Sequence, residues 1–273
     1  MKPFLKWAGN KYRIVDKIRG LLPPGRRLIE PFAGAAAVFL NTNYAYNIVN
    51  DLNVDLINLY LVLKAHGPAF IDECKSLFVP DNNSPDAYYA LRQEFNETKD
   101  RVRKSALFLY LNRHGYNGLC RYNSEGGFNV PFGRYKKPYF PYEEMMFFYH
   151  KAQTAEFLAE DFETVMRRAE PGDVIYCDPP YVPLSDTANF TSYSAGGFGP
   201  EEQLRLARVA EEVSAKGIPV LISNHRNSFT LEAYAAANIE SFDVQRFISC
   251  DGDNRNKATE LLALFNGRHI CVG

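Results

Sequence analysis

The chain has little of what marks a secreted, membrane-bound or metal-dependent protein. No apolar run reaches the roughly 18 residues of a membrane span, and residues 1–6 are not followed by the apolar core of a signal peptide. Its five cysteines, an odd number, show neither paired metal-ligand spacing nor the density of a disulfide framework. The sequence therefore predicts a cytosolic protein with reduced thiols, no membrane attachment and no metal site.

The chain has almost no net charge, but its positive charge is concentrated in one stretch. The net charge is −1, which does not favour indiscriminate binding of nucleic acid. Residues 101–140, however, contain eight Lys or Arg side chains and one acid, Glu125, so this stretch carries +7 and the remainder −8. Such an asymmetry indicates a local binding surface for a polyanion.

Helical patterns and apolar runs alternate at both ends of the chain. We expect helices at residues 12–22, 54–74 with a break at Gly67–Pro68, 88–96, 101–113, 142–153, 162–169 and 201–216. We expect strands at residues 27–30, 46–49, 155–158, 174–178, 220–225, 242–248 and 258–265. The alternation on both sides of residues 55–141 predicts one α/β sheet interrupted by an inserted domain, and 273 residues suffice for both.

The stretch Val174–Tyr181 is an apolar run that stops in an acid, two prolines and an aromatic. It is typical of a buried strand that presents chemistry at its carboxyl end. Because Pro179 and Pro180 have no N–H, the turn offers only acceptors, namely backbone carbonyls and the Asp178 carboxylate. Acceptors suit a planar NH2 group, such as the exocyclic amine of a base or a side-chain amide, and Tyr181 adds a stacking face. Taken alone, the motif is equally compatible with a proline turn capped by an acid.

A small-residue turn, Pro31–Phe39, opens a helix after the first expected strand. Gly34 allows the backbone to approach a ligand closely. Asp51 follows the second strand about 20 residues later, where ribose hydroxyls are bound in nucleotide-binding βα units. The glycine pattern is thin, so an ordinary tight turn remains the alternative.

Residues 112–137 combine glycine turns with short extended runs, which predicts a β-hairpin. Arg, Asn and Tyr interleave along it. Arg and Asn suit base edges, Lys and Arg suit phosphates, and an aromatic ring suits an unstacked base step. Further on, residues 182–200 are interpreted as a mobile flap over the site, and His225 as a structural hydrogen-bonding residue.

Together these segments resemble the Dam-type DNA adenine-N6 methyltransferases, the D12 class, group alpha. The likeness covers nearly the whole chain and is most specific in residues 4–9, 109–123, 128–140, 176–181 and 188–191. It implies a Rossmann-like S-adenosylmethionine-dependent methyltransferase sheet from residues 1–54 and 142–273, with an inserted helical and β-hairpin target-recognition domain at residues 55–141. It also implies methyl transfer from S-adenosylmethionine to N6 of adenine in duplex GATC.

The resemblance assigns roles to individual residues. The catalytic residues are Asp178, Pro179, Pro180 and Tyr181. The cofactor residues are Trp7, Lys11, Phe32, Gly34, Asp51 and Asp178. Family members usually have glycine at the positions of Asn10 and Ala36 and a basic residue at that of Asn256. The methyl group of Ala36 falls at a close-approach point, where it would either be accommodated or weaken cofactor binding.

The resemblance also assigns the DNA contacts. Arg121 is expected to address the guanine, and Leu119 and Pro131 the neighbouring thymine. Tyr116 is expected to wedge into the base stack, Asn117 to fill space near the vacated adenine, and Lys6 to lie near the first base pair. Arg134, Tyr135 and Lys136 are expected along the DNA backbone, and Arg113 and Asn123 complete the DNA-binding set.

The expected mechanism follows from the acceptors at the proline turn. The target adenine cannot react inside the duplex, so it is flipped into the site. Tyr181 stacks on it, and Asp178 and the Pro179 carbonyl accept the two N6 hydrogens. Neither a metal nor a covalent enzyme intermediate is needed, because the sulfonium cofactor carries an already activated methyl group.

Four alternatives stay open. A cofactor-blind relative that only binds GATC is motivated by Asn10 and Ala36, and an adenine methyltransferase of another sequence specificity fits the same motifs. A protein-glutamine methyltransferase would use the same turn but has no reason for the charge at residues 101–140. A dinucleotide oxidoreductase fits the first 51 residues and fails at the proline turn. We expect double-stranded DNA as the partner, no obligatory protein partner, and a cytoplasmic location in a bacterial or phage-encoded setting.

Overall fold

The computed structural model describes residues 1–181, 197–244 and 258–266. The chain forms two compact units. The first comprises residues 1–16, 33–43 and 49–159, and the second comprises residues 17–32, 44–48 and 160–273. Within the described ranges, no helix combines the length and the apolar character needed to cross a membrane.

The described residues contain one seven-stranded sheet with the strand order β3-β2-β1-β4-β5-β7-β6. The strands are β1 (Arg27–Glu30), β2 (Tyr46–Asn50), β3 (Ala155–Leu158), β4 (Asp173–Cys177), β5 (Val220–His225), β6 (Asn238–Val244) and β7 (Ala258–Phe265). Strands β1, β4 and β5 run parallel, and β7 is antiparallel to both β5 and β6. The expected α/β class with a Rossmann-like methyltransferase sheet is confirmed.

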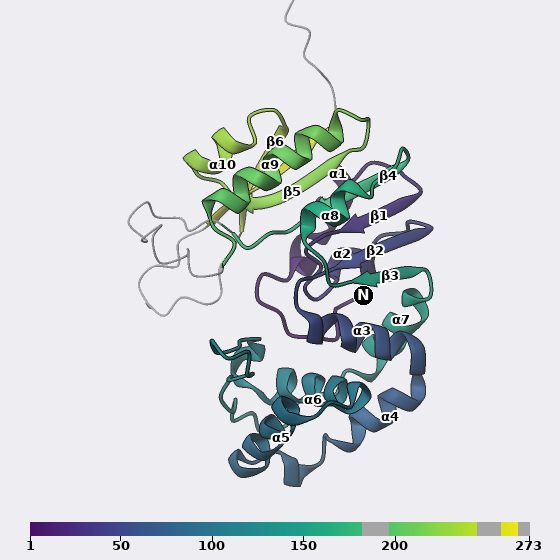
Figure 1. Ribbon diagram of the computed structural model, residues 1–273, viewed down its shortest axis with the longest axis vertical. Coiled ribbons are helices and arrows are strands. Elements are labelled where there is room, and N and C mark those ends of the chain that lie inside the picture. Colours follow the sequence, from purple (N-terminus) through teal and green to yellow (C-terminus); the bar gives the residue numbers. More distant parts are fainter. Residues whose placement is uncertain (182–196, 245–257, 267–273) are drawn as a thin grey trace, which may run out of the picture. The chain divides into compact units, whose positions relative to one another are not determined.

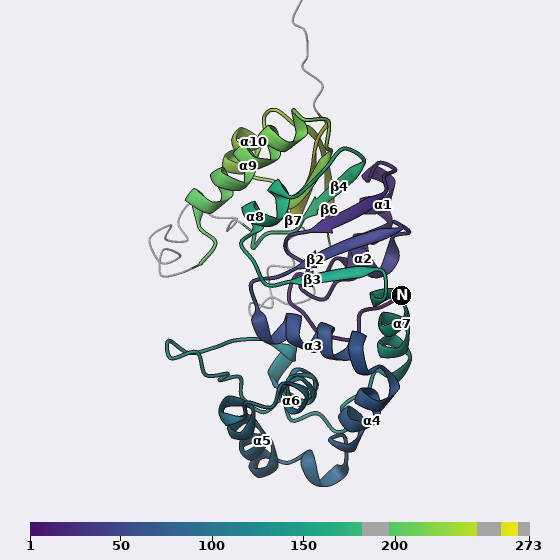
Figure 2. The ribbon, with the colours of Figure 1, turned by 45° about the vertical axis from the view of Figure 1, so that its right-hand side comes forward.

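In the second unit, β4 and β5 form the buried centre. All five residues of β4 are buried, as befits a parallel strand covered on both faces. The pairing register places Cys177 beside Ile222, so the next residues, Asp178 and Ser223, emerge together at the carboxyl end of the sheet. Figures 1 and 2 show α9 (Pro200–Ser214) lying against β5 and β7, with α10 (Ser228–Ala233) beside it.

In the first unit, helices surround α6 (Arg101–His114), whose residues from Ser105 to His114 are all buried. Around it lie α3 (Val54–His66), α4 (Pro68–Ser76) and α5 (Pro85–Glu97), as Figures 1 and 2 show, and α7 (Tyr142–Ala152) packs on α3 and α4. Local chemistry sets their ends. Asn53, Ser84 and Asp100 cap α3, α5 and α6 by accepting backbone N–H bonds. Gly67, at φ 50°, makes the expected break between α3 and α4.

The shorter elements account for most differences from the sequence-based expectation. They are η1 (Lys11–Ile14), α1 (Val15–Leu21), α2 (Ala37–Asn41), η2 (Pro80–Asn82), η3 (Tyr116–Gly118) and α8 (Phe162–Arg167). The single helix expected at residues 12–22 is a 3-10 turn followed by α1. Strand β6 begins at Asn238, four residues earlier than expected, and α10 was not expected because six residues show no clear helical period.

Residues 112–137 form two antiparallel branches, as expected, but these branches do not form the expected continuous β-hairpin. Two isolated antiparallel bridges, Gly115 to Phe132 and Tyr122 to Phe128, join the two branches. No continuous ladder forms within these described residues, because η3, in which Asn117 has φ 53°, interrupts the first branch. The expected flap at residues 182–200 falls largely outside the described residues, as do residues 188–191 and Asn256.

Candidate functional site

The Asp178 carboxylate is held by the neighbouring strand. Ser223, fully buried on β5, donates from Oγ to Asp178 Oδ1 at 2.8 Å. The buried hydroxyl of Tyr176 lies 3.0 Å from the same Ser223 oxygen. Burial, and next the charge of Asp178, raise the pKa of Tyr176 well above its ordinary value, so this hydroxyl keeps its proton and donates to Ser223. The result is a chain of hydrogen bonds, Tyr176 to Ser223 to Asp178, that orients the carboxylate.

The two proline carbonyls are not equivalent. Gln203 of α9 donates from Nε2 to the Pro180 carbonyl at 2.7 Å, while its own Oε1 accepts from Asn224 and Tyr234, each at 3.1 Å. This buried amide fixes the second half of the turn. The Pro180 carbonyl is thereby engaged by the protein, although the Pro180 side chain is exposed and Pro179 is buried.

The Tyr181 ring is held from two sides. Its hydroxyl donates to Glu260 Oε2 of β7 at 3.3 Å, and the His225 ring meets it edge-on with centroids 4.6 Å apart. Burial is the main cause that raises the pKa of Tyr181 well above its ordinary value, with Asp178 next. The ring is therefore neutral and fixed. His225 therefore contacts Tyr181 directly. We had expected His225 to have only a structural hydrogen-bonding role.

In the first unit, Asp51 closes the turn that carries Gly34. The Gly34 N–H donates to Asp51 Oδ2 at 3.0 Å and the Asn53 N–H donates to Asp51 Oδ1 at 2.9 Å. Burial raises the pKa of Asp51, and these two backbone N–H groups act in the opposite direction. Each carboxylate oxygen can accept a further bond, so the group is oriented and retains capacity for ligand hydroxyls.

Trp7 and Gly34 are in close contact. A Cβ added to Gly34, which has φ 47°, would lie 2.7 Å from Trp7 Nε1. The indole therefore lies directly over a backbone position that only glycine can fill. Lys11, mostly buried, donates from Nζ to the Gly9 carbonyl at 2.6 Å. The first unit thus brings together three of the expected cofactor residues, Trp7, Gly34 and Asp51.

Two of the three departures from the family pattern, Asn10 and Ala36, lie within the described residues. Asn10 has an extended backbone conformation and caps η1, accepting from the Tyr12 N–H at 2.9 Å, so no glycine is required there. Ala36 has φ 57° and ψ 36°, a left-handed conformation that favours glycine, yet its methyl group is fully buried in the core.

Phe32, another of the expected cofactor residues, lies in the second unit. Its ring packs on that of Phe162, with centroids 5.3 Å apart.

An extended segment, residues 119–123, alternates between outward and inward side chains. Leu119, Arg121 and Asn123 are exposed, whereas Cys120 and Tyr122 are half-buried. Asn129, on the opposite branch, holds Arg121 through its Oδ1 at 2.7 Å from Nε and its carbonyl at 3.3 Å from Nη2. One edge of the guanidinium is therefore fixed, and the remaining N–H groups can face a ligand.

Lys6, Asn117 and Tyr135 form a second group. The Tyr135 hydroxyl accepts from the Asn117 N–H at 3.0 Å, and Lys6 Nζ lies 3.8 Å from the centre of the Tyr135 ring. The backbone of Lys6 is clamped by Asn112, which accepts from its N–H at 2.9 Å and donates to its carbonyl at 2.7 Å. Tyr116, next to this group in sequence, is 51% exposed and available as an aromatic wedge.

The remaining residues expected to bind DNA differ in their exposure. Pro131, Arg134 and Lys136 are exposed. Asn123 is exposed, but its Oδ1 accepts from Gly127 N at 2.7 Å and so closes the hairpin turn. Arg113 is only 8% exposed, with its guanidinium over the Tyr139 ring, so it supports the surface from beneath rather than lining it.

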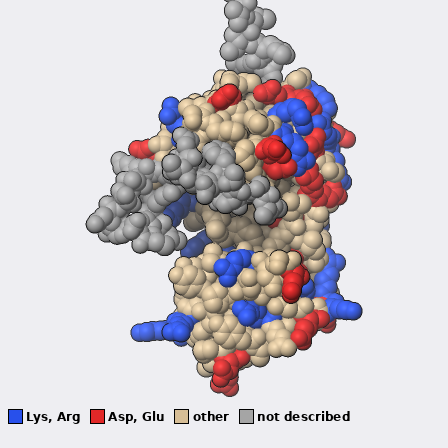
Figure 3. Space-filling view, turned by 60° about the vertical axis from the view of Figure 1, so that its left-hand side comes forward, with Lys and Arg blue, Asp and Glu red and all other residues tan. Residues whose placement is uncertain are grey.

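Residues 101–140 expose fewer unpaired cations than the sequence alone suggests. Arg103 is paired with Glu94 at 2.6 Å, Lys104 is paired with Asp55 at 3.3 Å, and Arg113 is buried. The remaining five of the eight cations are exposed: Arg101, Arg121, Arg134, Lys136 and Lys137. Figure 3 shows one face, on which separate groups of Lys and Arg are interspersed with uncharged surface and with groups of Asp and Glu. Such a surface suits contact with bases as well as phosphates.

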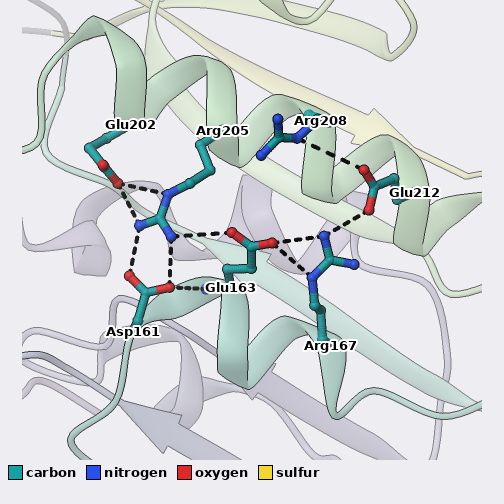
Figure 4. Close-up of polar contacts among 7 residues, drawn as sticks. All are labelled: Asp161, Glu163, Arg167, Glu202, Arg205, Arg208 and Glu212. Atoms are coloured by element: carbon teal, nitrogen blue, oxygen red, sulfur yellow. Dashed lines mark hydrogen bonds and ion pairs between the residues drawn. The ribbon is translucent and has the colours of Figure 1, made fainter.

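A second charged cluster, in the second unit, is structural. Arg205 of α9 forms ion pairs with Asp161 at 2.7 Å, Glu163 at 3.2 Å and Glu202 at 2.6 Å, and Figure 4 shows how Arg167 extends the network. Hydrogen bonding to Asp161 is the main cause that raises the pKa of Arg205, and the same bond lowers the pKa of Asp161. The cluster joins α8 to α9, the helix that carries Gln203.

Several residues that hold the site in place were not predicted from the sequence. Ser223, Gln203 and Glu260 fix the proline turn, and Asn129 fixes Arg121. Ser223, Gln203 and Glu260 lie outside the proline-turn motif, and Asn129 lies within the predicted hairpin but has no spacing that marks it as the partner of Arg121.

Comparison with known proteins identifies the family. Residues 7–248 match the D12 class of N6 adenine-specific DNA methyltransferases. The chain is 51% identical over 264 residues to the DNA adenine methylase of Escherichia coli strain K12, covering 97% of this chain and 95% of that protein. It is 51% identical over 265 residues to that of Vibrio cholerae serotype O1, covering 97% and 96%.

The match to the DNA adenine methylase of Serratia marcescens is 50% over 265 residues, covering 97% of this chain and 98% of that protein. Among solved structures, a precorrin 8w decarboxylase from Methanobacterium thermoautotrophicum aligns over 93% of this chain and 89% of its own. Its sequence identity is 10% and its TM-score is 0.38, values too low to indicate a shared fold or function. On the family match and the three methylases, the chain belongs to the D12 class of N6 adenine-specific DNA methyltransferases.

Proposed function

We propose that this protein transfers a methyl group from S-adenosylmethionine to N6 of an adenine flipped out of duplex GATC. The observation that carries the proposal is the held carboxylate of Asp178, which Ser223 orients at 2.8 Å at the end of β4, next to the fixed ring of Tyr181. The relatives at about 50% identity are DNA adenine methylases. The sequence GATC follows from the resemblance to Dam-type enzymes.

The residues present fit S-adenosylmethionine. Asp51, oriented by two backbone N–H groups, would hold the ribose hydroxyls. Trp7 and Gly34, which has no Cβ, would lie against the bound cofactor. Lys11, Phe32 and Asp178 complete the proposed cofactor set. When bound, the cofactor supplies an activated sulfonium methyl group. The buried methyl of Ala36 and the capping role of Asn10 remove the main reasons to favour a cofactor-blind relative.

The reaction requires the chain to orient the adenine and to accept protons. Tyr181 stacks on the flipped base, while Asp178 and the Pro179 carbonyl accept one N6 hydrogen each. These two bonds draw electron density to the amine nitrogen and aim its lone pair. Because Asp178 is the only charged member of the acceptor pair, it is the stronger base of the two and would accept the proton released after transfer.

Base recognition is proposed for residues 55–141, with the catalytic domain formed by residues 1–54 and 142–273. Arg121 would bind the guanine, Leu119 and Pro131 the thymine, and Tyr116 would enter the stack. Asn117, Lys6, Asn123, Arg134, Tyr135 and Lys136 complete the proposed DNA surface, and Arg113 supports it from beneath. The protein would act on DNA in the cytoplasm, in a bacterial or phage-encoded setting, without an obligatory protein partner.

The test removes the carboxylate. We expect Asp178→Ala to abolish transfer of a labelled methyl group to a GATC duplex while DNA binding, measured by fluorescence anisotropy, is retained. The matched control is Asp72→Ala, which removes an exposed carboxylate of α4 and should transfer methyl groups normally. Turnover by Asp178→Ala at the wild-type rate would refute the assignment.

A second variant tests the recognition surface. We expect Arg121→Ala to lose about 1–3 kcal/mol of discrimination against duplexes in which the guanine is replaced. The ratio of kcat/KM on GATC to that on the altered duplex measures this loss. An unchanged ratio would mean that Arg121 does not read the guanine.

A further inference from the structure

The first turn of α3 is connected to two sites at once. On one side, the Asn53 N–H donates to the Asp51 carboxylate, the proposed cofactor ligand. On the other, the Asn53 side chain donates from Nδ2 to Cys120 Sγ at 3.2 Å. Its Oδ1 accepts from the Leu56 N–H at 3.0 Å and caps the helix. Both ends of this short side chain are therefore engaged.

A second, stronger link joins the same turn to the same segment. The Tyr122 hydroxyl donates to Asp55 Oδ2 at 2.8 Å, and the other oxygen of Asp55 pairs with Lys104 at 3.3 Å. Thiol sulfur is a weak acceptor, so the bond from Asn53 to Cys120 contributes little by itself. A bond between a hydroxyl and a carboxylate is of the stronger, charge-assisted kind.

Because residues 119–123 are extended, the two hydrogen bonds to α3 also fix the side chains on the opposite side of this segment. In an extended segment, alternate side chains point to opposite sides. Cys120 and Tyr122 point inward to α3, so Leu119 and Arg121, which are exposed, point outward. The position of Arg121 is thus set from two directions, by the anchors on α3 and by Asn129.

We propose that the first turn of α3 is a positioning element that links cofactor binding at Asp51 to sequence reading at Arg121, through Asn53 to Cys120 and through Asp55 to Tyr122. Ligand hydroxyls bonded to Asp51 order the residues that start α3. The same residues hold segment 119–123. A bound cofactor therefore favours the arrangement in which Arg121 is aimed, and bound DNA favours cofactor binding by the same factor. This inference rests on the roles proposed above for Asp51 and Arg121.

The test uses Tyr122→Phe, which removes the hydroxyl but keeps the ring that packs edge-on against Phe128 at 5.7 Å. The control, Tyr44→Phe, removes a tyrosine hydroxyl that donates to the Pro23 carbonyl at 2.6 Å in the second unit. Cys120→Ala tests the weaker link without removing the cap that Asn53 provides. Circular dichroism establishes that each variant is folded.

Two quantities are measured with these variants. The first is the ratio of kcat/KM on GATC to that on a duplex with one altered base pair, which we expect to fall roughly tenfold in Tyr122→Phe, the loss of about one charge-assisted bond. The second is the factor by which S-adenosylhomocysteine tightens binding of a GATC duplex. We expect at least about fivefold tightening in the wild type and in Tyr44→Phe. In Tyr122→Phe the factor should fall below about twofold, with Cys120→Ala in between.

The outcomes separate this inference from the proposed function. If Tyr122→Phe keeps both the wild-type ratio and the wild-type tightening, or if the wild type shows no tightening, the linkage is wrong. If Arg121→Ala itself leaves discrimination unchanged, the proposed role of the segment fails instead. A structural role alone would lower the melting temperature of Tyr122→Phe without moving either quantity.

Discussion

Replacing Ser223 by alanine would isolate the contribution of a single hydrogen bond to catalysis. Ser223 donates to Asp178 Oδ1 at 2.8 Å and receives a bond from the Tyr176 hydroxyl at 3.0 Å. Neither Ser223 nor Tyr176 lies in the proline turn. The variant therefore changes how the carboxylate is held without removing a group that we propose to touch the substrate.

The magnitude follows from the kind of bond that is lost. A hydrogen bond to a charged group contributes about 1.5–3 kcal/mol. If that energy orients Asp178 for the transition state, Ser223→Ala lowers kcat by about 10- to 150-fold, since each 1.36 kcal/mol in the barrier is a factor of ten. Dissociation constants for DNA and for S-adenosylmethionine should stay within about threefold, because an interaction made mainly in the transition state affects kcat and not binding.

Stability and catalysis can be separated with a second substitution. Ser223→Ala leaves the buried Tyr176 hydroxyl without its acceptor, at a cost of about 1–3 kcal/mol in the free energy of unfolding. The double variant Ser223→Ala/Tyr176→Phe should recover stability in urea denaturation but not kcat. Tyr176→Phe alone keeps the bond from Ser223 to Asp178, so its kcat should fall less than that of Ser223→Ala. Single-turnover methyl transfer gives the rate, and a Ser223→Ala enzyme within about twofold of wild type would refute the reasoning.

Three further predictions concern binding and stability. Gly34→Ala places a Cβ 2.7 Å from Trp7 Nε1, so cofactor binding by calorimetry should weaken on the order of tenfold while DNA binding is unchanged; equal cofactor affinity would contradict the contact. Arg205→Ala removes the cation that lowers the pKa of Asp161 and should cost about 1 kcal/mol at pH 7, since solvent screens these partly exposed groups. This stabilisation is present above the unfolded pKa of Asp161 and is lost as the pH falls through its lower folded value, so acid unfolding curves of wild type and variant should converge there. Burial lowers the pKa of His114 to about 4, so the unfolded state binds the extra proton first and the wild type should lose about 2 kcal/mol between pH 6.5 and 5, whereas His114→Gln should not.

The fold was largely predictable because its signals are local in the chain. Strands at residues 27–30, 155–158 and 220–225 were predicted with the bounds that the structure gives. Strand β5 begins with a continuous apolar run because it is buried on both faces. Strand β3 instead alternates, with Glu156 exposed between two buried residues. The helix break at Gly67 was predictable for the same reason, since a glycine next to a proline stops a helix wherever it occurs.

The supporting contacts of the site were not predictable, since they join residues far apart in the chain. Ser223 lies 45 residues beyond Asp178, and Glu260 lies 79 residues beyond Tyr181. Only the register of β4 against β5, and of β5 against β7, makes them neighbours. Likewise, the pairing of Arg121 with Asn129 depends on how the two branches of residues 112–137 face each other, which the composition of either branch does not show.

The most direct measurement of the proposed function is restriction analysis of a methylated plasmid. An unmethylated plasmid is incubated with the protein and S-adenosylmethionine, then digested with one GATC nuclease that adenine methylation blocks and one that requires it. We predict protection from the first nuclease and cleavage by the second, with neither effect in Asp178→Ala. Full cleavage by the first nuclease after incubation with wild-type protein would contradict methylation of adenine in GATC.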